Sequence, residues 1–365
     1  MKLLTILLFS LLRFFTGVQE VGQPVEANLL FVGDAMQHQA QIDHALKAGN
    51  NKTYDYSDCF KLITPDIMEA DYAVCNLEVP LGGGPDYTGY PQFSAPDSYA
   101  IALRDAGFDM MLTANNHCLD RRDKAARRTL NALDKIGVDH IGTYHDAKDR
   151  AEKVPFIKDV NGIKIGFLNY TYGTNGIEPK EGAEVALIDR DKMAEEIKKT
   201  RDAGAEIVVV AVHWGVEYVL RENDHQRKLA DFLVDQGVDL VIGGHPHVIQ
   251  PMEVRHNDKE NKDVLVVYSL GNFISNMTTA DTTGGALVRA KIVRDANGKA
   301  KFKSADYDTF YTGRPEGSNR NFTVIPSWMA AEKVPAGQKG AWQIFDRSAQ
   351  NIFDNHNVNV PRRHK

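Results

Sequence analysis

The chain alternates between short apolar runs and longer amphipathic segments, a pattern that predicts an α/β fold. Apolar, often β-branched runs indicate buried strands, and segments with apolar residues at helical spacing follow most of them. The strands of this first group are predicted at 28–32, 72–77, 108–114, 140–142, 207–212 and 239–242. The helices are predicted at 37–48, 65–70, 99–106, 124–136, 189–203 and 224–236.

Antiparallel strands are expected to interrupt this alternation. The dipeptide Asn161-Gly162 separates apolar runs at 154–160 and 163–170, and it is the strongest short signal for a hairpin turn. A second group of strands is predicted at 248–254, 264–268, 286–294 and 301–310. Together the two groups indicate a sandwich with two central sheets.

The pattern weakens beyond residue 313. One or two helices within 328–350 are expected to pack on the core, so that 313–365 forms a C-terminal extension. Residues 355–365 read as a polar, basic tail, for which disorder is one expectation. The long Gly- and Pro-rich loop at 82–96 is expected to have a function, because loops of this length are seldom idle.

The N-terminal segment is not expected to belong to the fold. Lys2 precedes an apolar run at 3–12, which has the flank and length of a secretory signal and is too short to span a bilayer comfortably. Residues 1–20 are therefore predicted to be a signal peptide or an N-terminal anchor. The protein is expected to be exported and to reside in the periplasm, on the cell surface or attached to the membrane.

Composition and charge exclude several classes of protein. The 365 residues carry a net charge of −6 and no basic stripe, which argues against a nucleic-acid partner. The three cysteines are an odd number without paired spacing, so they indicate neither a disulfide framework nor a structural zinc finger. The length predicts one large domain, or one large domain with a smaller appendage.

Polar side chains with metal-ligand chemistry follow the predicted strands. Asp34 comes just after the first strand, and His38 lies four residues on, where one helical turn would let both side chains face one ion. Glu78 follows the second strand, and its two oxygens could bridge two cations. Asn116 follows the third strand and offers a neutral carbonyl ligand, while the adjacent His117 projects toward the substrate.

Imidazoles occupy the ends of the later strands. His213 ends a very apolar run, where a lone histidine is more often a core residue than a ligand. His245-Pro246-His247 is a stronger signal, because the proline fixes the backbone between two imidazoles at a strand end. Taken alone, Asp34 could be a turn residue and His117 a loop residue bonded to backbone.

The convergence of these residues decides the interpretation. The carboxyl ends of parallel strands open into one crevice, so the carboxylates, the amide and the imidazoles are expected to meet there. Without cations, such a cluster would bury unpaired polar groups at high cost. With two divalent ions roughly 3.5–4 Å apart, it becomes a compensated site that can hold a bridging hydroxide. The sequence therefore predicts a two-metal hydrolytic site.

With these residues in view, the chain resembles the bacterial capsule-synthesis CapA family, also called poly-γ-glutamate biosynthesis proteins, which is similar in fold to calcineurin-like metallophosphoesterases. The resemblance covers about 28–310, and it implies a four-layer α/β/β/α sandwich of mixed sheets, with the family domain at 28–312. Its motifs are Gly33-Asp34, Asn76-Leu77-Glu78, Asn115-Asn116-His117, His213-Trp214-Gly215, Gly244-His245-Pro246-His247 and Ser269-Leu270-Gly271-Asn272-Phe273.

The resemblance also implies roles for single residues. Asp34 and His247 would hold one metal, Asn116, His213 and His245 the other, and Glu78 would bridge the two. His117 would be the general acid, and contacts to the substrate or to the metal ligands would come from Glu217, Gly271 and Asn272. The ions implied are Mn, Zn or Fe. Phosphoesterases usually begin with Asp-x-His, whereas this chain has Asp34-Ala35-Met36, so only His38 could supply that imidazole.

The function expected from the sequence is metal-dependent hydrolysis in the synthesis of an anionic envelope polymer such as poly-γ-glutamate. A bridging hydroxide would attack a phosphoester or an amide, with His117 protonating the leaving group. Two alternatives stay open at this point. One is a non-catalytic accessory protein that binds the polymer or a membrane synthase. The other is an extracytoplasmic phosphatase acting on small phosphoesters.

Overall fold

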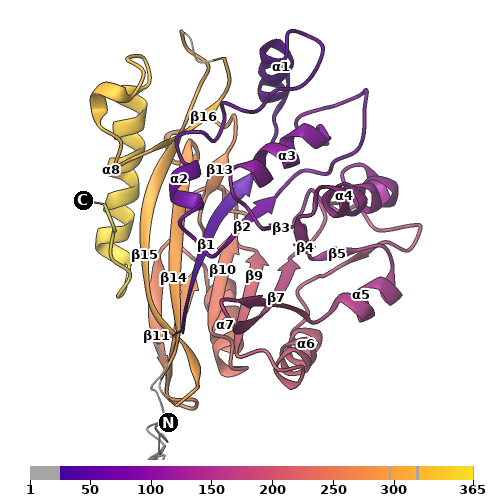
Figure 1. Cartoon of the computed structure of the whole chain (residues 1–365), viewed down its shortest axis with the longest axis vertical. Helices are drawn as coiled ribbons and strands as arrows, with labels where there is room; N and C mark the ends of the chain where they lie inside the picture. Colours follow the sequence, from indigo (N-terminus) through magenta and orange to yellow (C-terminus); the bar gives the residue numbers. More distant parts are fainter. Residues whose placement is uncertain (1–24, 296, 318–319, 365) are drawn as a thin grey trace, which may run out of the picture.

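The computed structural model describes residues 25–295, 297–317 and 320–364. Within them, two mixed sheets lie face to face (Figure 1). The first sheet has eight strands, in the order β16 (Thr323–Pro326), β15 (Ala300–Gly313), β14 (Gly284–Arg294), β1 (Val25–Ala35), β2 (Tyr72–Leu77), β3 (Met110–Leu112) and β4 (Asp139–Ile141), with β13 (Asn272–Ile274) also paired to β1.

The second sheet has six strands in the described part of the chain. Their order is β11 (Met252–Asn257), β12 (Lys262–Val267), β10 (Leu240–Gly244), β9 (Ile207–His213), β7 (Ile163–Thr171) and β6 (Phe156–Val160). Strands β6 and β7 form the predicted hairpin, and Asn161 and Gly162 both have the positive φ that this turn requires. A small ribbon pairs β5 (Thr143–Tyr144) with β8 (Glu184–Val185).

The core between the sheets is built from alternate residues of their strands. Leu29 and Phe31 of β1 share one apolar cluster with Phe167 of β7 and Val209 of β9. The intervening residues Leu30 and Val32 face the opposite way, into a second cluster. This alternation follows from the two-residue period of a strand, and each strand thus contributes side chains to the apolar clusters on both of its faces.

Helices cover the outer faces of both sheets. The helices over the first sheet are α1 (Gln39–Ala48), α2 (Thr64–Ile67), α3 (Asp97–Asp105) and α4 (Arg122–Ile136). The helices over the second sheet are α6 (Arg190–Asp202) and α7 (Asp224–Asp235), with the short α5 (Ala147–Lys153) nearby. The predicted α/β fold with a four-layer α/β/β/α arrangement is confirmed. None of the described helices combines the length and apolar character needed to cross a bilayer. The predicted signal or anchor at 1–20 lies outside the described residues.

The C-terminal extension packs on the core, and its helix runs beyond the range 328–350 in which helices were predicted. Helix α8 (Lys339–His356) lies along β15 (Figure 1) and inserts an apolar stripe into the main core, made of Trp342, Phe345, Ala349, Ile352 and Phe353. This stripe continues past residue 350, where the predicted helix ended.

The tail after α8 is docked rather than disordered. The amide of Tyr307 donates to the Pro361 carbonyl at 3.0 Å, and the amide of Arg363 donates back to the Tyr307 carbonyl at 2.9 Å. His364 Nδ1 lies 2.8 Å from Asp308 Oδ2, and its ring stacks on Trp328. Specific polar partners on β15 therefore fix a segment whose composition alone suggested a free tail.

Candidate metal centre

The candidate ligands meet at the carboxyl ends of strands from both sheets. Asp34 lies near the end of β1, Glu78 directly follows β2, and His213 ends β9. His245 and His247 follow β10. All five side chains are buried, with exposed fractions between 0% and 3%. Parallel strands of two facing sheets thus deliver carboxylates and imidazoles to one place.

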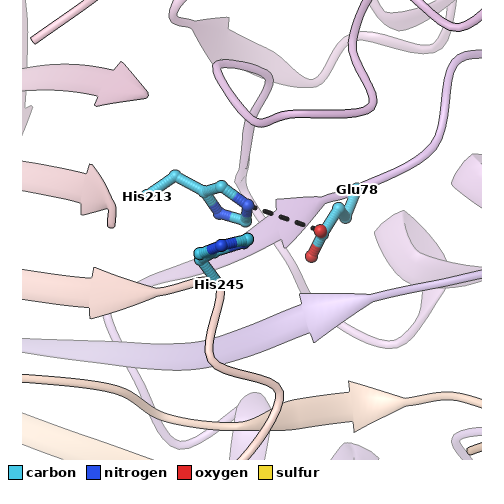
Figure 2. A group of neighbouring side chains, drawn as sticks. All are labelled: Glu78, His213 and His245. Carbon is cyan, nitrogen blue, oxygen red and sulfur yellow. Dashed lines mark ion pairs between the residues drawn. The ribbon is translucent and has the colours of Figure 1, made fainter. Parts of the chain in front are cut away.

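These side chains form two groups that share one residue. The ligand atoms of Glu78, His213 and His245 lie within 4.8 Å of one another, and so do those of Asp34, Glu78 and His247. Figure 2 shows the first group, in which His213 points toward the Glu78 carboxylate. Glu78 Oε1 lies 3.4 Å from His213 Nε2 and 3.8 Å from His247 Nε2. A carboxylate between two imidazoles of different groups is placed to contact two cations.

Asp34 is held by a close approach of backbones and by three donors. A side chain at Gly33 would bring its Cβ to 1.9 Å from the Gly271 carbonyl oxygen, so only glycine lets β1 pair with the segment entering β13. The Asp34 carboxylate accepts hydrogen bonds from Asn76 Nδ2 at 2.8 Å and from the His245 amide at 3.3 Å. It also lies 3.2 Å from His247 Nδ1.

The pKa values of the two carboxyl groups are displaced in opposite directions. Burial raises the pKa of Glu78 well above its usual value, and the nearby Asp34 charge adds to this effect. Burial also opposes ionisation of Asp34, but the hydrogen bonds from His247 and Asn76 favour the charged form, and the Asp34 pKa is lowered. Without a cation, the site therefore favours a negative charge on Asp34 and disfavours a second one on Glu78.

Two of the histidines, His213 and His245, are kept in the neutral form that binds metals. Burial lowers the pKa of His245 to about 4, with the neighbouring His247 contributing. Burial likewise lowers the pKa of His213 well below its ordinary value. The backbone of this loop is strained, since His245 has φ 100° and His247 has φ 57°. Non-glycine residues rarely adopt such angles outside functional sites, where the surrounding structure maintains them.

Two asparagines complete the site. Asn116 Oδ1 lies 2.9 Å from His213 Nε2, so the predicted amide ligand reaches the first group. Asn76, which the sequence analysis did not single out as a site residue, donates to Asp34 and lies 3.4 Å from His213 Nδ1. The sequence could have indicated Asn76, because it lies two residues before Glu78 and side chains two residues apart on a strand point to the same side.

His117 stands at the mouth of the site and is paired with a carboxylate. Its Nδ1 lies 2.8 Å from Asp120 Oδ2, and both side chains are buried. Asp120 also accepts the Phe93 amide at 2.8 Å, and the Phe93 ring meets the His117 ring edge-on. With Nδ1 bonded, Nε2 is the nitrogen left for a substrate. Asp120 was absent from the predicted site, although its position three residues after His117 offered a signal.

The remaining predicted residues lie around the centre. Asn272 Oδ1 lies 3.0 Å from His247 Nδ1, and it is beside Asp34 because β13 pairs with β1. Glu217 lines the cleft that leads to the site. His38 lines this cleft too, but it belongs to neither group of ligand atoms.

The geometric argument for His38 was therefore wrong. Residue 38 is the N-cap of α1 and Asp34 belongs to a strand, so no helical turn joins them. His38 Nδ1 is 3.3 Å from Gln41 Oε1 and accepts the Asn276 amide at 3.3 Å. Burial lowers the pKa of His38 to about 4. It is a neutral residue of the cleft wall.

The donor set fits a divalent metal. Glu78 Oε1 and His245 Nδ1 are fully buried, and neither has a hydrogen-bond partner. Such atoms cost free energy unless something satisfies them, and a cation would satisfy both. Carboxylate, amide and imidazole ligands suit Mn, Fe and Zn. The centre therefore has the chemistry of a metal site, and it opens to a cleft of about 450 Å³.

The chain is similar in sequence to two curated proteins of capsule and PGA biosynthesis. The chain is 31% identical over 271 residues to the capsule biosynthesis protein CapA of Bacillus anthracis, covering 72% of this chain and 62% of that protein. It is 30% identical over 284 residues to the PGA biosynthesis protein CapA of Bacillus subtilis, covering 76% and 70%. The chain thus spans less than two thirds of the first relative's length.

Among solved structures, the NAD nucleotidase NadN of Haemophilus influenzae aligns with a TM-score of 0.47 and 10% identity, covering 94% of this chain and 65% of that one. The sulfate thiohydrolase SoxB of Thermus thermophilus aligns with a TM-score of 0.46 and 13% identity, covering 89% and 61%. The family described as bacterial capsule synthesis protein PGA_cap matches residues 28–277, more than half of the sequence. The chain belongs to this family.

Proposed function

We propose that this protein is a metal-dependent hydrolase of capsule or poly-γ-glutamate synthesis, holding two divalent ions. The family and the names of its relatives support the biological context. The observation that carries the proposal is Glu78, which is shared by two groups of ligand atoms beside the His117–Asp120 pair. Export, and work beside a membrane polymer synthase, are part of the proposal and rest on the N-terminal sequence and the family context.

The residues divide between the two ions. Asp34 and His247 would hold one, while Asn116, His213 and His245 would hold the other, with Glu78 common to both. When bound, the ions would supply Lewis acidity and make water a nucleophile at neutral pH. The surrounding structure that maintains the positive φ of His245 and His247, together with the Asn272 contact to His247, would hold these ligands in position.

His117 and Asp120 would deliver a proton to the leaving group. Asp120 fixes the His117 ring through Nδ1, so a proton at Nε2 faces the cleft. Protonation of a leaving oxygen or nitrogen from this atom is general acid catalysis, which typically contributes 10²–10⁴-fold in rate. Phe93 packs against the ring and keeps its orientation while excluding water from that side.

The test is direct hydrolysis by the full chain loaded with Mn²⁺ or Zn²⁺. Aryl phosphates and γ-glutamyl peptides are the two substrate classes, because phosphoester and amide hydrolysis use the same metal chemistry. We expect turnover that disappears on chelation and falls at least about 100-fold in His117→Gln. Bound metal without turnover on either class would contradict catalysis and favour the accessory role.

A further inference from the structure

The walls of the cleft differ chemically from its floor. The floor is the metal centre, reached past His117 and His247. Tyr90, Gln92, Phe93, Asn175 and Tyr218 contribute to the walls. Among the described residues that line the cleft, none is a lysine or an arginine. A substrate that extends beyond the metals therefore meets rings, amides and a carboxylate.

The carboxylate is Glu217, and it forms no ion pair in the described part of the chain. It directly precedes Tyr218, and its carboxylate offers acceptor lone pairs to a ligand in the cleft. A chain of substrate carboxylates passing this point would meet a like charge. Arg314 lies behind the wall rather than in its lining, and its guanidinium donates to the Asn276 and Met277 carbonyls. The walls therefore disfavour a polyanion.

Two tyrosines are conspicuously exposed at this cleft. Tyr90 is 76% exposed and Tyr218 is 55% exposed, and they come from segments far apart in the sequence. Tyr218 is held at φ 67° while its amide donates to the Pro246 carbonyl at 2.8 Å. Pro246 lies between two candidate metal ligands. This hydrogen bond ties the Tyr218 backbone to the loop that carries both histidines, and the centroid of the Tyr218 ring lies 6.3 Å from that of His247.

We propose that these walls bind a neutral sugar ring next to the group that the metals act on, a substrate class that rests on the proposed hydrolase function. The C–H faces of a sugar pack on aromatic rings, whose faces carry partial negative charge. Vicinal hydroxyls donate to carboxylate and amide oxygens, which Glu217, Gln92 and Asn175 supply. The substrate would be a saccharide that carries one hydrolysable ester or amide.

Binding without turnover tests the proposal independently of catalysis. The metal-loaded full chain is titrated by calorimetry with a neutral N-acetylglucosamine trimer, a neutral glucan trimer and a γ-glutamate trimer. We expect a neutral saccharide to bind more tightly than the γ-glutamate trimer. Tyr90→Ala and Tyr218→Asn should each weaken saccharide binding about 10-fold, since one ring contact is worth roughly that factor. Asparagine is chosen at 218 because it tolerates positive φ.

The control is Tyr87→Ala, in the same loop as Tyr90 but outside the cleft lining, which should leave binding unchanged. Metal content and melting temperature show that each variant is folded. Glu217→Gln should improve binding of the γ-glutamate trimer. No saccharide binding, tighter γ-glutamate binding by the wild type, or tyrosine variants that bind normally would each overturn the proposal. Saccharide binding without hydrolysis would instead contradict only the hydrolase.

Discussion

His117 Nδ1 lies 2.8 Å from Asp120 Oδ2, and this carboxylate also accepts the backbone amide of Phe93. The pair joins the loop after β3 to the long loop at 82–96. Because Asp120 sets which nitrogen of His117 faces the cleft, it should matter for rate more than for metal binding.

Asp120→Asn is expected to lower kcat about 10–100-fold while metal content stays at the wild-type level. The asparagine can hold the ring less well and cannot stabilise its charged form. Steady-state kinetics and elemental analysis check this. Asp134→Asn is the matched control, since Asp134 pairs with His140 at 3.0 Å elsewhere in the fold. Equal loss of rate in both variants would show a general effect on folding.

Metal stoichiometry should depend on which ligand is removed. His245→Ala should retain one ion, as should His247→Ala, because each histidine belongs to a different group. Glu78→Gln should weaken both ions, since the two groups share that carboxylate. Elemental analysis of dialysed protein provides the measurement, with His256→Ala, an exposed histidine of β11, as the control. If Glu78→Gln retained both ions in full, the shared-ligand arrangement would be wrong.

The stability of the metal-free protein should fall in acid because of His245. Its pKa is about 4 in the folded protein and 6.5 in the unfolded chain. Between these values the unfolded chain binds a proton that the folded protein does not, so stability is complete above pH 6.5 and is lost as the pH falls toward 4. This difference is worth about 3 kcal/mol.

Urea unfolding of chelator-treated protein at pH 7 and pH 5 measures the effect. His245→Asn should lose less stability between these two pH values than the wild type does. Glu78, whose pKa is raised, increases the stability of the folded protein as the pH falls. Both proteins contain Glu78, so its contribution is common to the two measurements. His225→Asn, an exposed position on α7, serves as the control. If His245→Asn lost as much stability between pH 7 and pH 5 as the wild type, the loss would not be due to His245.

The apolar stripe of α8 should be essential for stability. Phe345 is 1% exposed and lies against Gly284 of β14, whereas its neighbour Ile344 is 50% exposed. Phe345→Ala should cost about 3–5 kcal/mol of unfolding free energy through the cavity it leaves. Ile344→Ala should cost less than about 0.5 kcal/mol. Denaturant unfolding of both variants gives the comparison, and equal losses would show that α8 does not complete the core.

Much of the metal centre could be predicted because it follows from strand topology. Asp34, Glu78 and His213 each come at the end of an apolar run, and parallel strands bring such ends to a common edge. The same reasoning failed for His38, since four residues mean one turn only inside a helix. Asp120 was missed because its contact with His117 depends on how a loop turns, which periodicity does not report.

The rest of the fold depended on contacts between distant segments. The predicted first strand ended at residue 32, but β1 continues to Ala35, where both β13 and β2 pair with it. Asp34 is matched to Asn272 of β13 and to Asn76 of β2. The sequence indicated only a polar, basic tail, whereas its partners are backbone and side chains of β15. No local pattern reveals a partner that lies dozens or hundreds of residues away.

The pairing of β13 with β1 has a consequence for synthesis of the chain. Asp34 is made early, but the strand that fixes it and orients His247 is completed only at Ile274. A growing polypeptide that stops before that point contains the candidate ligands but lacks the β13 strand that pairs beside Asp34. The cluster of candidate ligands is therefore completed late in the synthesis of the chain.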